Sequence, residues 1–129
     1  MLLPPAITIH GLDDANTALR PGRPVLLLSA PGAALFAGCG WWRAVIAKAA
    51  IATRTAPLDA LDCADAPGRA LEALAIGCRI IVLEPCPAWP SVADRAARAG
   101  ATLLQARPKS LDLATQGAHR HVAAWLGFG

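Results

Sequence analysis

Residues Gly77-Cys-Arg-Ile-Ile-Val-Leu-Glu-Pro85 contain a short apolar run with a glycine before it and a proline after it. The same order of residue types occurs in Gly22-Arg-Pro-Val-Leu-Leu-Leu-Ser-Ala-Pro31 and in Gly100-Ala-Thr-Leu-Leu-Gln-Ala-Arg-Pro108. Each glycine follows a helical pattern and suits the left-handed position that ends a helix. Each run is mainly apolar, as a parallel strand covered on both faces requires, and each proline stops the ladder of hydrogen bonds. The three segments predict helix–strand units in a parallel sheet.

The segments between these runs alternate in the same way. Further strands are expected over residues 6–10 and 58–63, and helices over residues 13–19, 41–52, 66–76 and 92–99. Asp65 and Ser91 are the expected N-caps of the helices over 66–76 and 92–99. Ser110 is expected to cap a last helix that carries the apolar residues between positions 111 and 126.

This alternation predicts a single α/β domain over residues 1–129, a three-layer α/β/α sandwich with a mainly parallel sheet of about five strands. The strand order does not follow from the sequence. A flavodoxin-like order, 2-1-3-4-5, is the default expectation, and the partial-barrel order 1-2-3-4-5 is the alternative. A chain of 129 residues is long enough to bury a core without disulfides or a structural metal.

Composition and charge favour some classes of partner over others. The net charge is only +3 and the arginines are scattered, without the basic stripe and interleaved aromatic residues of a nucleic-acid binder. We therefore expect no nucleic-acid partner. Apolar residues make up 55% of the chain and include four tryptophans, which favours a homodimer or another homo-oligomer joined through an aromatic surface. The abundance of Ala, Gly, Pro and Arg indicates a bacterial source.

Two features bear on the compartment. Residues 24–42 carry no charge, but Pro31 and three glycines interrupt this run, so it predicts a strand, a turn and a helix start instead of a membrane span. The N-terminal residues lack the basic and apolar regions of a signal peptide. The four cysteines are then expected to be reduced thiols. A soluble, cytoplasmic protein with no membrane partner is the expectation.

In parallel α/β sheets, ligands bind beyond the carboxyl ends of the strands, where the following loops converge. The expected loops at this edge cover residues 11–14, 29–32, 63–68, 84–86 and 107–110. We predict that a small ligand or a protein partner binds there without a cofactor, and the candidate ligand-binding residues are Asp13, Ser29, Gly32, Asp62, Cys63, Asp65, Glu84 and Lys109. No motif in the sequence names a reaction, so whether the chain is an enzyme stays open.

The segment Cys63-Ala-Asp-Ala-Pro-Gly-Arg69 offers an alternative. Its spacing resembles that of the cysteine phosphatase loop, in which a thiolate attacks while backbone N–H groups and an arginine hold the anion. However, Asp65 would place a carboxylate in the anion cradle, and Pro67 removes one N–H donor. A cysteine-dependent phosphatase or sulfur-transfer enzyme using Cys63 and Arg69 is therefore the second hypothesis.

A third hypothesis is a small-molecule enzyme that acts through carboxylates such as Asp13, Asp62 and Glu84, whose relative geometry the sequence does not give. A metal site is not expected. The cysteines at positions 39, 63 and 86 could approach the carboxyl edge near His10 or Asp65, but no two have the close spacing of a zinc knuckle.

Overall fold

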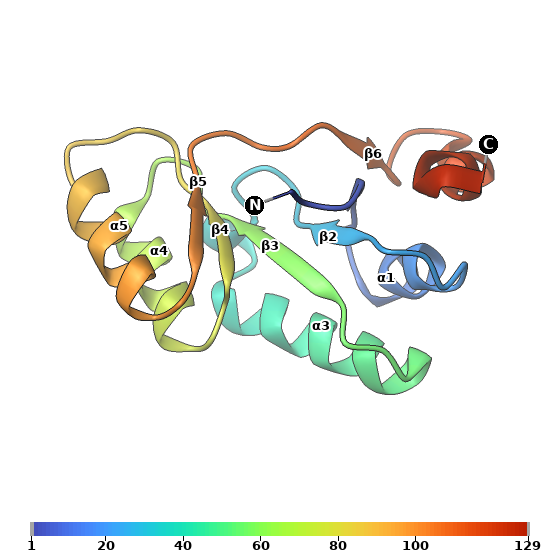
Figure 1. The fold of residues 1–129 in the computed structure, drawn as a ribbon, viewed down its shortest axis with the longest axis horizontal. Helices are drawn as coiled ribbons and strands as arrows, with labels where there is room; N and C mark the ends of the chain where they lie inside the picture. The colour runs from blue at the N-terminus through green and yellow to red at the C-terminus, as the bar shows by residue number, and fades with distance from the viewer. Residues whose placement is uncertain (1, 129) are drawn as a thin grey trace.

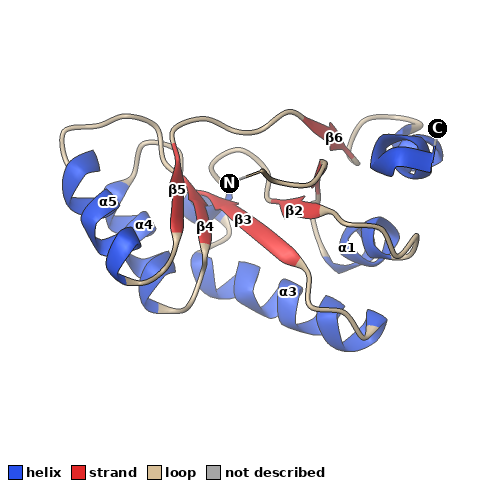
Figure 2. Ribbon diagram, viewed as in Figure 1, coloured by secondary structure: helices blue, strands red, loops and turns tan. Residues whose placement is uncertain are grey.

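The strands of the protein form one parallel sheet (Figures 1 and 2). The computed structural model describes residues 2–128. Within them the strands are β1 (Ala6–Thr8), β2 (Leu26–Leu28), β3 (Leu58–Asp62), β4 (Ile80–Val82), β5 (Thr102–Leu104) and β6 (Ser110–Asp112). The strand order is β5-β4-β3-β2-β1-β6, and every neighbouring pair is parallel. The predicted α/β class with a parallel sheet is confirmed.

The connecting helices begin and end within three residues of their predicted positions, except for the short helix over residues 33–36, which the sequence pattern does not predict. They are α1 (Leu12–Leu19), α2 (Ala33–Phe36), α3 (Cys39–Thr53), α4 (Pro67–Ala75) and α5 (Trp89–Arg98), followed by a 3-10 helix, η1 (Ala118–His121), and a π-type segment, η2 (Ala124–Phe128). The capping roles expected for Asp65 and Ser91 are wrong. The N-caps are Ala66 and Ala88, and a proline in the first turn of each helix sets its start instead. No helix in the described part of the chain is both long and apolar enough to cross a membrane.

Two expectations about the sheet are corrected. The flavodoxin-like order is wrong, because β1 lies between β2 and β6, and the first five strands follow the partial-barrel order. The sheet also has a sixth strand, since residues 110–112 pair with β1 and do not start a helix. Ser110 does not cap a helix; its hydroxyl lies 2.7 Å from the hydroxyl of Thr8. This cross-strand hydrogen bond and the backbone ladder together explain why the segment is a strand.

Gly77 and Gly100 end helices as the sequence predicts. Gly77 has a φ of +99°, and its N–H donates to the Leu74 carbonyl at 3.2 Å. The following N–H, of Cys78, donates to the Ala73 carbonyl at 3.0 Å, which completes a Schellman motif. Gly100, with a φ of +68°, ends α5 with the same pair of bonds. Each motif turns the chain from a helix directly into the next strand.

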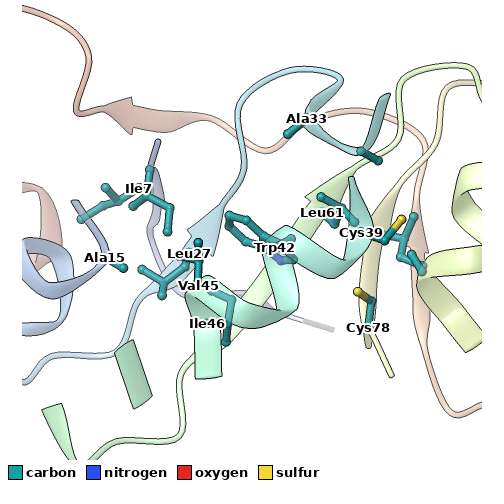
Figure 3. Packing of buried hydrophobic residues seen from close by; sticks show 14 of the residues in the cluster. Ile7, Ala15, Leu27, Ala33, Cys39, Trp42, Val45, Ile46, Leu61 and Cys78 are labelled. Atoms are coloured by element: carbon teal, nitrogen blue, oxygen red, sulfur yellow. The ribbon is translucent and has the colours of Figure 1, made fainter. Parts of the chain in front are cut away.

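The two faces of the sheet are covered differently. The larger hydrophobic cluster joins one face to residues from α1 to α5, and Figure 3 shows the fully buried Trp42 of α3 near Leu27, Leu61 and Val45. The smaller cluster consists of strand residues, among them Leu26, Leu28, Ile80 and Val82, and no helical residue described here belongs to it. Because each right-handed crossover from β1 to β5 moves to the next strand in the same direction, the described helices lie on one face. The expected three-layer arrangement is therefore corrected, since residues 2–128 form no helix layer on the other face.

The connection from β5 to β6 crosses the face of the sheet on which none of the described helices lies. These strands are the opposite edges of the sheet, yet only six Cα steps separate Leu104 from Ser110. Six steps reach at most about 21 Å, whereas the outer strands of a flat six-stranded sheet would be about 24 Å apart. The sheet must therefore curve, with the helices outside and the smaller cluster inside. Figure 1 shows this connection running from β5 to β6 on the side of the sheet away from α3, α4 and α5.

Candidate ligand-binding site

A pocket of about 620 Å³ lies at the carboxyl edge of the sheet. Loops after four consecutive strands form it, and its lining consists of Pro31 and Gly32 after β2, Asp62 and Ala64 at the end of β3, Val82, Glu84 and Pro85 at the end of β4, and Gln105, Ala106 and Arg107 after β5. A separate hollow of about 300 Å³ at the amino ends of β2 and β3 is smaller. The larger pocket lies at the edge where parallel α/β sheets bind their ligands.

Arg107 connects this pocket to three strands. One of its Nη1 hydrogens donates to Asp62 Oδ2 at 2.8 Å, and the other to the Ser29 carbonyl at 2.9 Å. Nη2 donates to Thr8 Oγ1 at 3.0 Å. The side chain of Arg107 is 24% exposed and that of Asp62 is 5% exposed, so this ion pair is largely removed from solvent. The guanidinium thereby fixes the crossing segment over the ends of β1, β2 and β3.

Hydrogen bonds engage both carboxylate oxygens and the backbone N–H of Asp62. Its Oδ1 accepts the Ala64 N–H at 2.7 Å while its Oδ2 accepts from Arg107, and its own N–H donates to Ser29 Oγ at 2.9 Å. The bond to Ala64 closes a tight turn in which Ala64 has a φ of +50°, a conformation that an L residue rarely adopts. The Ala64 carbonyl then accepts the Glu84 N–H at 2.8 Å, which joins the loops after β3 and β4.

A second polar pair lies next to this network, between β1 and β6. The ring Nε2 of His10 lies 2.6 Å from Asp112 Oδ1, which also accepts the Ala114 N–H at 2.9 Å. Burial acts to raise the pKa of Asp112, but the hydrogen bonds from His10 and Ala114, with the charges of His10 and Arg107, leave it below its usual value. The carboxylate of Asp112 is therefore stabilised in its ionised form.

The structure brings some of the predicted site residues together and separates others. Gly32, Asp62 and Glu84 line the pocket, and the buried Ser29 lies beneath it, bonded to Asp62 and Arg107. The remaining candidates are outside the lining: Asp13, Asp65 and Lys109 are exposed, and Cys63 is buried in the larger hydrophobic cluster. A pocket thus lies at the predicted edge, and only part of the predicted set lines it.

The geometry around Cys63 does not suit a nucleophile. Burial, with smaller contributions from Cys39, Cys78 and Asp62, raises the pKa of its thiol to about 12. Arg69 Nη1 lies 2.8 Å from Glu72 Oε1 in an exposed ion pair. A phosphatase-type loop needs a thiolate and a free arginine, and this arrangement provides neither. Within residues 2–128, no group of three or more His, Cys, Asp or Glu side chains is arranged to hold a metal ion.

No family model, curated protein or solved structure matches this chain. The case for a function therefore depends on the pocket and its polar groups.

Sequence reasoning misses three polar residues of this site. Thr8 is the polar last residue of the otherwise apolar strand β1, and a buried polar residue signals a hydrogen-bond partner. Arg107 lies in an expected edge loop, but nothing in its neighbourhood indicates that it reaches back to Asp62. Gln105 belongs to the lining because the chain crosses the sheet immediately after β5, and the sequence pattern does not reveal that crossing.

Proposed function

We propose that this chain is a non-catalytic module that binds a small organic ligand in the pocket at the carboxyl ends of β2 to β5. The observation that carries this proposal is the Asp62–Arg107 ion pair, which is removed from solvent and borders a concave, mainly apolar pocket. Ligand pockets are usually clefts of roughly 300–1,000 Å³ with apolar walls and a few polar groups, and this pocket has that size and that composition. A buried ion pair is expensive to desolvate, which favours a functional reason for its position.

The composition of the lining favours binding over catalysis. It contains no serine, cysteine or histidine, the side chains that most often act as nucleophiles or general bases. Asp62 and Glu84 share the pocket, as an acid–base enzyme would need, but both Asp62 oxygens already accept hydrogen bonds within the protein. The carboxylate hypothesis is therefore the weaker one, and Cys63 lies outside the pocket altogether.

A fragment screen on the ¹⁵N-labelled protein tests this proposal. Binding fragments should shift the amide signals of Gly32, Ala64 and Gln105, which come from three different loops of the pocket. The variant Ala106→Phe adds a large side chain to an exposed alanine of the lining and should weaken these fragments. Ala97→Phe, on the exposed side of α5, is the matched control and should not. A screen at millimolar concentration in which no fragment moves the pocket amides would contradict the proposal.

We also propose that the module works in a bacterial cytoplasm, as a homo-oligomer and without nucleic-acid partners. The four cysteines are free thiols, as a reducing compartment maintains them. Phe36, 71% exposed, and the exposed Leu35 and Trp41 lie within seven consecutive residues at α2 and the start of α3, and exposed apolar residues of this kind support self-association. Light scattering on the wild type and on Phe36→Ser tests this; a monomer at micromolar concentration in both cases contradicts it.

A further inference from the structure

The residues that line the pocket carry more negative than positive charge. Its lining holds two carboxylates, from Asp62 and Glu84, and one guanidinium, from Arg107. Asp62 and Arg107 lie 2.8 Å apart and compensate each other. Glu84 is exposed to solvent and forms no ion pair with any described residue. The charge that remains for a ligand is therefore the single negative charge of Glu84.

Arg107 is not available as an anion site in the way that an arginine usually is. Three of its five N–H donors are used by Asp62, Ser29 and Thr8, so the guanidinium is turned toward the protein. An anion that approached the remaining N–H groups would lie close to the Asp62 carboxylate, and like charges at short distance repel. The nearby cation Lys109 is outside the lining. A phosphate or carboxylate ligand is disfavoured by this arrangement.

The walls of the pocket favour a ligand whose uncharged part is apolar. Pro31, Val82, Pro85 and Ala106 present mainly apolar surface, which an apolar ligand body can cover. Covering these walls would also exclude water from the neighbourhood of Glu84, which strengthens an ion pair formed there. A cation without an apolar body gains only a solvated charge contact, and such contacts are weak.

We infer that the ligand is a small organic cation, an ammonium compound with an apolar body whose charge lies against Glu84. This inference rests on the proposed function, since it assigns the ligand class of the same pocket. It names Glu84 as the residue that determines the charge specificity. Arg107 and Asp62 then act as positioning residues that hold the loops around the ligand.

Three matched compounds test the inference by NMR titration at pH 7: 3-phenylpropylamine, 3-phenylpropan-1-ol and 3-phenylpropanoate. The amine should bind about fivefold more tightly than the alcohol, the size expected of one partly solvated ion pair, and the carboxylate most weakly. In Glu84→Gln the preference for the amine over the alcohol should disappear. Asp65→Asn removes an exposed carboxylate from the same edge outside the lining, and it should keep the preference.

The outcomes separate this inference from the proposed function. If the alcohol or the carboxylate binds as tightly as the amine while the pocket amides shift, the cation inference is wrong and the pocket still binds ligands. An equal loss of preference in Glu84→Gln and Asp65→Asn would mean that the summed negative charge of the carboxyl edge attracts the amine, and not Glu84 in particular. This result also overturns the inference. If neither these compounds nor the fragment collection shifts the pocket amides, the proposed function fails as well.

Discussion

Arg107 Nη1 lies 2.8 Å from Asp62 Oδ2, and this contact joins the connection between β5 and β6 to the end of β3, 45 residues earlier in the chain. The connection crosses the face of the sheet on which none of the described helices lies, and the ion pair holds it there. The hydrogen bonds of Arg107 to Ser29 and Thr8 extend the same attachment to two further strands.

Arg107→Met should strongly destabilise the protein. The substitution keeps an extended side chain but leaves Asp62 buried without its counter-charge, which costs about 3–5 kcal/mol when one partner of a buried pair is removed. Urea unfolding measures the change. The double variant Asp62→Asn with Arg107→Met removes the uncompensated charge and should recover part of the loss.

The control for this prediction is Arg98→Met. Arg98 and Asp94 lie 3.0 Å apart on α5, but their side chains are 74% and 59% exposed, so removing the pair should change stability little. A loss in Arg107→Met no larger than that of Arg98→Met would contradict the role given to Arg107.

Sequence reasoning indicates the edge at which the candidate pocket lies better than it indicates the residues that line this pocket. Asp62 and Glu84 are predictable because Asp62 ends β3 and Glu84 lies two residues after β4, and strand ends meet at one edge of a parallel sheet. The strand order is not predictable in this way, since it depends on the direction of each crossover and on curvature. The three residues of β6 have no apolar run, so only their pairing with β1 identifies them as a strand.

The unknown register of β3 also explains why the sequence places Cys63 at the ligand edge, whereas the structure buries it in the larger hydrophobic cluster. Its spacing from Arg69 matches a catalytic loop, but residues 61 and 63 point to the helical side of the sheet whereas Asp62 points to the pocket side. Alternation along a strand decides which of two neighbouring polar residues reaches the ligand edge. Without the register of β3, the sequence gives both residues equal weight.

Cys63 should be unreactive toward iodoacetamide in the native protein at neutral pH. Burial raises the pKa of its thiol, and of the Cys78 thiol, to about 12, so almost no thiolate is present and access is blocked. Cys86 is only partly buried and should be alkylated first. Mass spectrometry after short labelling identifies the modified peptide, and rapid labelling of Cys63 at pH 7 would support the cysteine-dependent alternative.

These raised values also predict how stability depends on alkaline pH. A thiol whose folded pKa is higher than its unfolded value, 9.0 here, stabilises the fold below that unfolded value. The contribution is lost as the pH rises from about 9 to about 12, because the unfolded chain releases the protons first. Unfolding in urea at pH 8 and pH 10.5 measures this, and Cys78→Ala should show a smaller decrease between the two.

Asp112→Asn should lower stability near neutral pH and have less effect in acid. The lowered pKa of Asp112 means that its carboxylate stabilises the fold above the unfolded value, and the contribution is lost as the pH falls through the folded value. Because Asp112 is 44% exposed, we expect less than about 1 kcal/mol. Thermal melting between pH 3 and pH 6 compares the variant with Asp94→Asn, an exposed control on α5. A difference that grows toward pH 3 would contradict this pairing.

Ala64→Gly should stabilise the protein, although replacing alanine by glycine usually does the opposite. Ala64 has a φ of +50°, and this left-handed conformation costs an L residue about 1–2 kcal/mol. Glycine adopts it freely but makes the unfolded chain more flexible, which offsets about 0.5–1 kcal/mol. The net gain should be as much as about 1 kcal/mol in urea unfolding.

Ala47→Gly gives the matched comparison for this substitution. Ala47 is exposed within α3 in the right-handed conformation, so glycine there should destabilise the protein by about 1 kcal/mol. Opposite signs for the two variants would show that the turn after β3 is strained and that the bond from the Ala64 N–H to Asp62 holds it. If both variants lose stability equally, the turn after β3 is not strained.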